Sequence, residues 1–313
     1  MKITTRTFSF VSKYDEVTIH GTCMIPEQPI GILQMVHGMC EHEGRFHFFM
    51  RRMAEKGYIT LMHDNRGHGR SVKSKEDIGY CYDSMEKGFV EDIYAVTRRI
   101  RREYPDLPLV LYGHSLGSLA VRAYLRRYDD AVDGVIVSGC PGYNSVVPLG
   151  KAIVKFIMKL KGPHYYSSFM QRLVLGGFEW RFRKEKRQYA WLAAKETVAE
   201  EFMEEPLCNF TYTLNGFLTL LNLETLTYKA KRYQVKNPSL PILFLSGQDD
   251  PCYISEKKWY QAIDRLHDLG YEQTTAIRFP GMRHEIHNEV EQELIYSEID
   301  TFFRDNVLLF DGI

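Results

Sequence analysis

The feature that most constrains the fold is the segment of residues 107–117, in which a serine stands between two different apolar patterns. Residues 109–112 form an uncharged run that predicts a short buried strand, and Gly113-His114-Ser115-Leu116-Gly117 follows directly. The pattern over residues 119–127 then predicts a helix. A strand, a sharp turn with serine at its apex and a helix match the Gly-x-Ser-x-Gly turn that presents a serine nucleophile.

Strand and helix patterns alternate on both sides of this turn. Short apolar runs predict strands over residues 31–37, 58–63, 132–138, 240–246 and 274–279, and residues 4–11 and 17–24 predict a hairpin. Amphipathic patterns predict helices over residues 46–56, 84–104, 256–269 and 288–305. Such alternation predicts a mostly parallel sheet with helices on both faces.

The alternation is interrupted once. Residues 143–238 are rich in helix-forming and aromatic residues and contain no clear strand pattern. We therefore predict one α/β core formed by residues 1–142 and 239–313, with residues 143–238 inserted as a helical cap.

Two further predicted strands end in residues that can activate a serine. A serine hydroxyl needs a base to take its proton and an acid to orient that base. Asp249 and Asp250 follow one strand and His284 follows the last one, so the order is Ser115, Asp, His, as expected for an α/β-hydrolase. We prefer Asp250 as the acid because a proline follows it and fixes the chain.

Other residues near these positions leave alternatives open. His287 competes with His284 as the base, but we interpret it as a surface residue at the start of the last helix. The oxyanion formed during acyl transfer needs N–H donors, and we expect them from the backbone of Leu116 and Met39. His37 and Glu41 either brace the loop that carries Met39 or are solvated polar residues.

Several motifs together indicate a family: His37-Gly38-Met39-x-Glu41-His42-x-x-Arg45, Asp64-x-Arg66-Gly67-His68-Gly69-x-Ser71, Gly113-His114-Ser115-Leu116-Gly117, Gly247-x-x-Asp250 and His284-Glu285. In these motifs the chain resembles the monoacylglycerol lipase branch of the α/β-hydrolases, which includes lysophospholipases and serine aminopeptidase-like hydrolases. The resemblance implies Ser115 as nucleophile, Asp250 as acid, His284 as base, Met39 and Leu116 as oxyanion donors, and a helical cap.

The predicted cap is both aromatic and basic. Its aromatic residues either line a channel for an acyl chain or attach the cap helices to the core. Residues 151–232 hold 14 lysines and arginines against 8 acids, a net charge of +6, and Lys151, Lys155 and Lys159 share a face of an otherwise apolar helix. This pattern indicates either transient contact with an anionic membrane surface or a solvated cap face.

Composition excludes some other classes. The formal net charge is zero, so nucleic-acid binding has no global electrostatic support. The sequence contains no signal-like or membrane-spanning apolar run, and we expect a cytoplasmic protein that is either free or peripherally bound at a membrane. Six scattered cysteines predict reduced, mostly buried thiols and no zinc site. We expect no metal or organic cofactor, and the oligomeric state is left open.

The leading functional hypothesis is a serine hydrolase that cleaves a monoacylglycerol, a lysophospholipid or a similar acyl ester. A second is a serine aminopeptidase of the proline-iminopeptidase type, which needs a carboxylate for the substrate amine; the cap offers Glu179, Glu200, Glu201, Glu204 and Glu205 without singling one out. A third is a noncatalytic binding protein with a hydrolase fold. The complete set of three catalytic residue types argues against the third.

Overall fold

The computed structural model describes residues 2–229 and 233–308, and its central element is one β-sheet. In this part of the chain the sheet has eight strands: β1 (Ile3–Val11), β2 (Thr18–Pro26), β3 (Gly31–Val36), β4 (Tyr58–His63), β5 (Leu109–His114), β6 (Gly134–Ser138), β7 (Ile242–Gly247) and β8 (Thr274–Phe279). The strands β3 to β7 are buried along their whole length, which explains their continuous apolar runs.

The sheet is mostly parallel, with the strand order β1-β2-β4-β3-β5-β6-β7-β8. Only β2 is antiparallel, to β1 and to β4. The register places His114 opposite Ser138, and Ser138 opposite Leu245. The carboxyl ends of β5, β6 and β7 therefore meet at one edge of the sheet, which is where open α/β sheets place their sites.

Helices cover both faces, so the predicted fold class is confirmed. The helices α1 (His47–Glu55) and α9 (Gln292–Phe303) pack on one face. The other face is covered by α2 (Met85–Glu103), α3 (Leu116–Tyr128) and α8 (Glu256–Leu269). Because neighbouring residues of a strand point to opposite faces, Leu33 belongs to the first core and Ile32 to the second.

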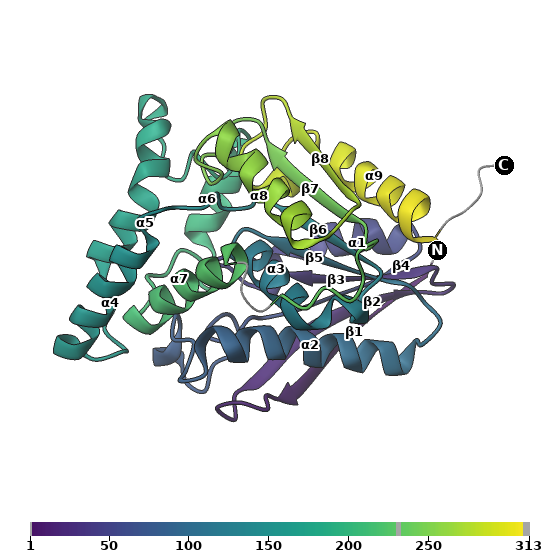
Figure 1. Cartoon of the computed structure of the whole chain (residues 1–313), viewed down its shortest axis with the longest axis horizontal. Helices are drawn as coiled ribbons and strands as arrows, with labels where there is room; N and C mark the ends of the chain where they lie inside the picture. Colours follow the sequence, from purple (N-terminus) through teal and green to yellow (C-terminus); the bar gives the residue numbers. More distant parts are fainter. Residues whose placement is uncertain (1, 230–232, 309–313) are drawn as a thin grey trace.

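The segment between β6 and β7 is helical. It contains α4 (Val147–Lys161), α5 (Ser168–Arg181), α6 (Glu196–Glu204) and α7 (Leu214–Tyr228), which we call the cap helices. They lie together on the left of Figure 1, to one side of the sheet. The domain boundaries, with residues 143–238 as the cap and residues 1–142 and 239–313 as the core, stay a proposal.

The predicted last helix begins too early. Residues 286–288 form a short 3-10 helix, and α9 starts only at Gln292. Between them Glu289 is buried and extended, and its carboxylate accepts hydrogen bonds from the backbone N–H groups of Arg283, Ala194 and Lys195. These contacts with distant parts of the chain hold Glu289 out of the helix that its local sequence favours.

Candidate active site

Ser115 occupies a strained turn between β5 and α3. Its backbone angles are φ 54° and ψ −117°, which a residue with a side chain rarely adopts. A close approach on the other side of the turn explains the last glycine of the motif, because a Cβ on Gly117 would lie 2.2 Å from the carbonyl oxygen of Val36. The Ser115 N–H donates to the carbonyl of Ser138 at 3.0 Å, which ties the turn to β6.

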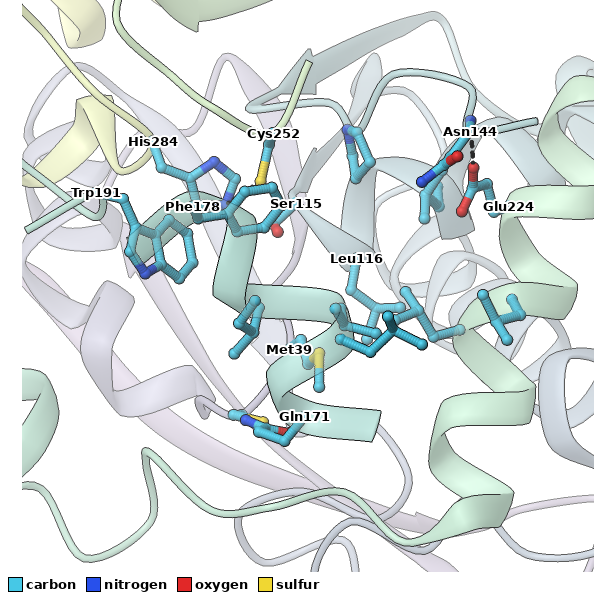
Figure 2. A pocket seen from close by; sticks show the side chains of 18 of the residues that line it. Met39, Ser115, Leu116, Asn144, Gln171, Phe178, Trp191, Glu224, Cys252 and His284 are labelled. Carbon is cyan, nitrogen blue, oxygen red and sulfur yellow. Dashed lines mark hydrogen bonds between the residues drawn. The ribbon is translucent and has the colours of Figure 1, made fainter. Parts of the chain in front are cut away.

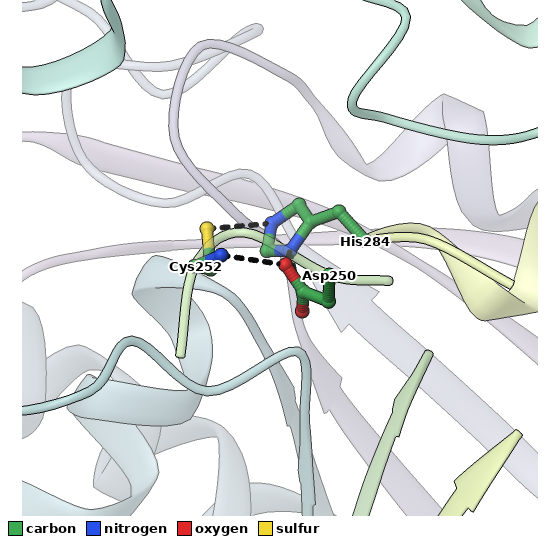
Figure 3. A group of neighbouring side chains, drawn as sticks. All are labelled: Asp250, Cys252 and His284. Carbon is green, nitrogen blue, oxygen red and sulfur yellow. Dashed lines mark hydrogen bonds and ion pairs between the residues drawn. The ribbon is translucent and has the colours of Figure 1, made fainter. Parts of the chain in front are cut away.

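His284 and Asp250 form a buried pair. His284 Nδ1 lies 3.1 Å from each carboxylate oxygen of Asp250. Figure 3 shows the imidazole beside this carboxylate, with Cys252 next to both. Asp250 also accepts hydrogen bonds from the Ser246 hydroxyl at 3.1 Å and the Cys252 N–H at 2.8 Å. The neighbouring Asp249 is exposed, so of the two candidate acids it is Asp250 that contacts the histidine.

The environment of His284 strengthens it as a base. Burial alone would lower the pKa of the imidazole, but the charge of the Asp250 carboxylate and the hydrogen bond to it raise the pKa well above its ordinary value. The loop that carries His284 is held by the segment before α6, because the Glu285 N–H donates to the Leu192 carbonyl at 2.7 Å. The Trp191 ring lies against the imidazole, with 5.2 Å between the ring centroids.

Ser115 and His284 border the same cavity, and Figure 2 shows them at the same end of it. The second ring nitrogen of His284, Nε2, lies 3.8 Å from Cys252 Sγ. The Ser115 hydroxyl makes no hydrogen bond to any side chain within residues 2–229 and 233–308. A Ser115–His284 hydrogen bond is therefore not formed among the described residues.

Asp250, Cys252 and His284 each offer one ligand-type atom within 4.8 Å of the others, close enough to share a metal ion. A thiol binds metal as the thiolate, and burial raises the pKa of Cys252 to about 11. The Asp250 oxygens are already shared by His284, Ser246 and the Cys252 N–H. This donor set fits an acid that orients a base better than it fits a metal site.

The two predicted oxyanion donors lie in the cavity wall. Met39 and Leu116 both line the cavity, and neither backbone N–H donates a hydrogen bond to an acceptor in the described part of the chain. The Met39 loop is braced from inside the protein: the Gly38 N–H donates to Glu41 at 2.5 Å, and His37 Nε2 accepts from the Asn65 N–H at 2.9 Å. His37 and Glu41 are buried, so the alternative of solvated residues is wrong.

The interpretation of His287 as a surface residue is also wrong. His287 is fully buried, and its ring stacks on Phe46 with 4.6 Å between centroids. Its ring also lies 4.8 Å from that of His114, which is buried beside His284. Burial lowers the pKa of His287 to about 3, so the neutral ring serves as packing beneath the site.

Arg45 links the two loops of the site, a role to which sequence reasoning assigned no residue. Its guanidinium donates to Glu41 at 3.0 Å and, with two nitrogens, to Glu285 at 2.7 and 2.9 Å. All three side chains are nearly buried. Burial, followed by the charge of Glu285, raises the pKa of Glu41 to about 7. At Glu285 burial also acts to raise the pKa, but the charge of Arg45 outweighs it and holds the pKa of that carboxyl below its ordinary value.

We expect Arg45→Met to lower the free energy of unfolding by about 3–5 kcal/mol, because it leaves two buried carboxyl groups without their cation. The loss should grow between pH 5 and pH 8. Buried acids with raised pKa values bind protons more tightly in the folded state, so stability falls as the pH rises above their ordinary values. Urea unfolding at both pH values measures the effect.

Arg52, on the neighbouring helix α1, provides the matched control. It pairs with Glu293 at 2.9 Å, but both side chains are substantially exposed. Arg52→Met should therefore change stability by no more than about 1 kcal/mol. Equal losses for Arg45→Met and Arg52→Met would contradict a structural role for the buried pair.

The cavity has a volume of about 450 Å³ and is mostly apolar. One part lies near Phe178, Trp191 and the catalytic candidates, and the other extends past Leu116 toward Asn144 and Glu224 (Figure 2). The cap aromatics divide between the two predicted roles. Phe178, Tyr189, Trp191 and Phe202 line the cavity, whereas several others pack elsewhere or are exposed, such as Trp180.

Comparisons with known proteins agree with this architecture. A monoacylglycerol lipase of Mycolicibacterium smegmatis is 34% identical over 135 residues, which are 42% of this chain and 46% of that protein. A putative monoglyceride lipase of Schizosaccharomyces pombe is 24% identical over 286 residues, or 88% of this chain and 67% of the relative. The matched region is thus less than half of the first relative.

The fold is found in solved structures. A thermostable carboxyl esterase from Bacillus coagulans, crystallised with glycerol, superposes with a TM-score of 0.89 at 22% identity over 97% of this chain and 99% of that chain. The model of the serine aminopeptidase S33 family matches residues 27–291, well over half of the chain. The predicted resemblance is confirmed, and the protein belongs to the serine aminopeptidase S33 family of α/β-hydrolases.

Proposed function

We propose that this α/β-hydrolase is a serine esterase that cleaves a monoacylglycerol, a lysophospholipid or a similar monoacyl lipid through an acyl-enzyme on Ser115. The observation that carries the proposal is the buried Asp250–His284 pair, whose histidine borders the same apolar cavity as the strained Ser115. The names of the lipase relatives and of the esterase structure support an ester substrate.

The proposed reaction runs through Ser115, His284 and Asp250. Ser115 Oγ attacks the ester carbonyl while His284 Nε2 takes its proton, and Asp250 holds the Nδ1–H and stabilises the imidazolium. The N–H groups of Leu116 and Met39 bind the oxyanion. His284 then returns the proton to the leaving alcohol, and a water activated by the same nitrogen releases the acid from Ser115.

Product release from three substrates tests the proposal: a monoacylglycerol, a lysophospholipid and an aminoacyl anilide. Release of fatty acid from either lipid supports the esterase. Turnover of the anilide alone would replace it by the aminopeptidase. A fluorophosphonate probe for active-site serines adds a measurement that needs no substrate, and absence of labelling at Ser115 would favour the noncatalytic binding protein.

The aminopeptidase alternative is supported by the family description. However, none of the five cap glutamates considered for it lines the cavity. Glu179 accepts hydrogen bonds from the Trp191 indole at 2.9 Å and the Tyr189 N–H at 3.1 Å. The amine-binding carboxylate that this activity needs is therefore not supplied by any of those five residues.

The outer surface of the cap supports transient contact with a membrane. Phe156 and Leu160 on α4 and Trp180 on α5 are each about two-thirds exposed, at 64%, 65% and 65%. Lys155 and Lys159 are also exposed on α4, each directly before Phe156 or Leu160 in the sequence. Apolar side chains with flanking lysines suit the surface of an anionic lipid bilayer.

Within residues 2–229 and 233–308, every helix is too short or too polar to cross a membrane. A cytoplasmic enzyme that contacts membranes through the cap is the corresponding proposal for its location.

We expect the protein to sediment with anionic vesicles more than with neutral ones. Lys155→Glu with Lys159→Glu should weaken binding to anionic vesicles by at least about tenfold, because each lysine near the bilayer contributes about 1 kcal/mol. Lys75→Glu with Lys257→Glu makes the same charge change on exposed residues outside the cap. Equal binding to both vesicle types, or equal effects of the two pairs, would remove the proposed contact.

A further inference from the structure

A buried acid at the far side of the cavity has no role in the reaction described so far. Glu224, on α7, is only 8% exposed and forms part of the cavity wall. Figure 2 shows it with Asn144 on the side opposite His284 and Trp191. One carboxylate oxygen, Oε1, accepts the Asn144 N–H at 2.9 Å. The other, Oε2, accepts no hydrogen bond from the part of the chain that the structure describes.

The surroundings of Glu224 are largely apolar. The cavity wall beside it is aliphatic, with Leu119, Val147 and Leu221. Burial raises the pKa of Glu224 to about 7, against the opposing effects of the Asn144 N–H and the Arg122 guanidinium. An acid in an apolar cavity is costly unless each polar atom has a partner. Oε2 is not among the fully buried atoms that lack a partner, so it is open to the cavity and a donor on a bound ligand can reach it.

We propose that Glu224 is a specificity-determining residue that receives a hydroxyl group carried on the acyl chain of the substrate, so that the enzyme prefers hydroxyacyl esters to unsubstituted ones. This inference rests on the proposed ester hydrolysis, because it places the reacting carbonyl at Ser115. The aliphatic wall between Leu116 and Glu224 suits the methylene chain, and the carboxyl beyond it suits the hydroxyl.

A hydroxyl fits this site better than an ammonium group. It donates to an ionised carboxylate, and it both donates to and accepts from a protonated carboxyl, so it suits either form of Glu224. Arg122 is fully buried near the acid, with its guanidinium 5.1 Å from the centre of the Tyr228 ring and bonded to the Tyr228 hydroxyl at 3.2 Å. Its positive charge disfavours a second cation in the same place.

The test compares glycerol monodecanoate with analogues that carry one hydroxyl at positions 6 to 10 of the chain, and with the matching amino analogues. The enzymes are the wild type, Glu224→Gln and Glu224→Met. Gln keeps an acceptor for the Asn144 N–H and can bond a hydroxyl, whereas Met can do neither. We expect wild-type kcat/KM to be at least about tenfold higher for one hydroxy ester than for the plain ester. Glu224→Gln should keep most of this preference for the hydroxy ester, and Glu224→Met should lose it.

Glu200→Gln, which removes an exposed acid of the cap, is the control and should leave the ratio unchanged. A wild-type preference for the amino esters that disappears in Glu224→Gln would overturn the proposal in favour of an amine. Plain esters cleaved as fast as every hydroxy ester would overturn it while leaving the esterase intact.

A binding measurement separates failure of the inference from failure of the proposed function. Calorimetry with free decanoic acid and its hydroxy forms needs no turnover. If no ester is cleaved, the proposed function fails, and the Glu224 site is still decided by binding. The hydroxyl site is supported if one hydroxy acid binds at least about tenfold tighter than decanoic acid and this difference is lost in Glu224→Met. Equal affinities of the plain and hydroxy acids overturn the hydroxyl site.

Discussion

Replacing Ser115 with alanine is expected to lower kcat for fatty-acid release by roughly 10,000-fold or more. The reason is that no other residue of the described cavity wall lies both in a strained turn and beside a buried acid–base pair. The variant keeps the Leu116 and Met39 N–H groups, so some residual rate above water is expected. KM should change little, because the substrate is bound mainly by the apolar wall. Initial rates with a monoacylglycerol, measured to the limit of detection, give the result.

The stability of the variants shows whether such a loss is local. Alanine keeps the Cβ and therefore the strain at φ 54°, so Ser115→Ala should unfold at a Tm close to that of the wild type. Ser115→Gly relieves the strain and should be equally inactive but at least as stable. Activity of Ser115→Ala within tenfold of the wild type would show that the nucleophile lies elsewhere.

The order and type of the elements could be predicted because buried strands and amphipathic helices have different periods. The bounds of β4 (Tyr58–His63), α8 (Glu256–Leu269) and β8 (Thr274–Phe279) agree with the predicted ranges residue for residue. The start of α9 could not be predicted in the same way. The carboxylate that interrupts the helix is Glu289, and its partner Ala194 lies 95 residues away in the sequence.

Within the site, too, residues at strand ends could be predicted from the sequence and contacts between distant residues could not. Ser115, Asp250 and His284 follow parallel strands, and such strands end at a common edge, so a sequence pattern suffices to bring these residues together. Arg45 belongs to the motif of residues 37–45. Its hydrogen bond to Glu285 spans 240 residues, so no local sequence pattern predicts that contact. The burial of His287 likewise depends on Phe46, at the other end of the chain.

The burial of Glu224 has a signal in the sequence. The helix α7 reads Leu-Asn-Gly-Phe-Leu-Thr-Leu-Leu-Asn-Leu-Glu-Thr-Leu-Thr-Tyr, and Glu224 is its one charged residue. A single acid in an otherwise uncharged helix indicates a buried carboxyl with a specific partner. Its partner, Asn144, lies 80 residues earlier, so the position of the acid in the cavity could come only from the structure.

Asp250→Asn should lower kcat roughly 1,000- to 10,000-fold while leaving the shape of the site unchanged. In the wild type both carboxylate oxygens accept from the Nδ1 side of His284, which leaves Nε2 unprotonated for Ser115. The Asn amide can keep the Cys252 N–H bond through its oxygen, but its NH₂ group then faces Nδ1 as a donor. The imidazole responds by carrying its proton on Nε2, where it cannot accept one from serine.

The matched control is the neighbouring acid Asp249, whose side chain is exposed. Asp249→Asn removes the same charge and should alter kcat less than about twofold.

The pH profile of activity supplies a second readout for Asp250→Asn. His284 must be neutral to act, so activity falls as the pH drops through its pKa, which Asp250 raises against the effect of burial. In Asp250→Asn this acidic limb should move to lower pH, because the stabilising charge is gone. Equal rate losses for the two variants, or a limb that stays in place, would mean that Asp250 does not orient the base.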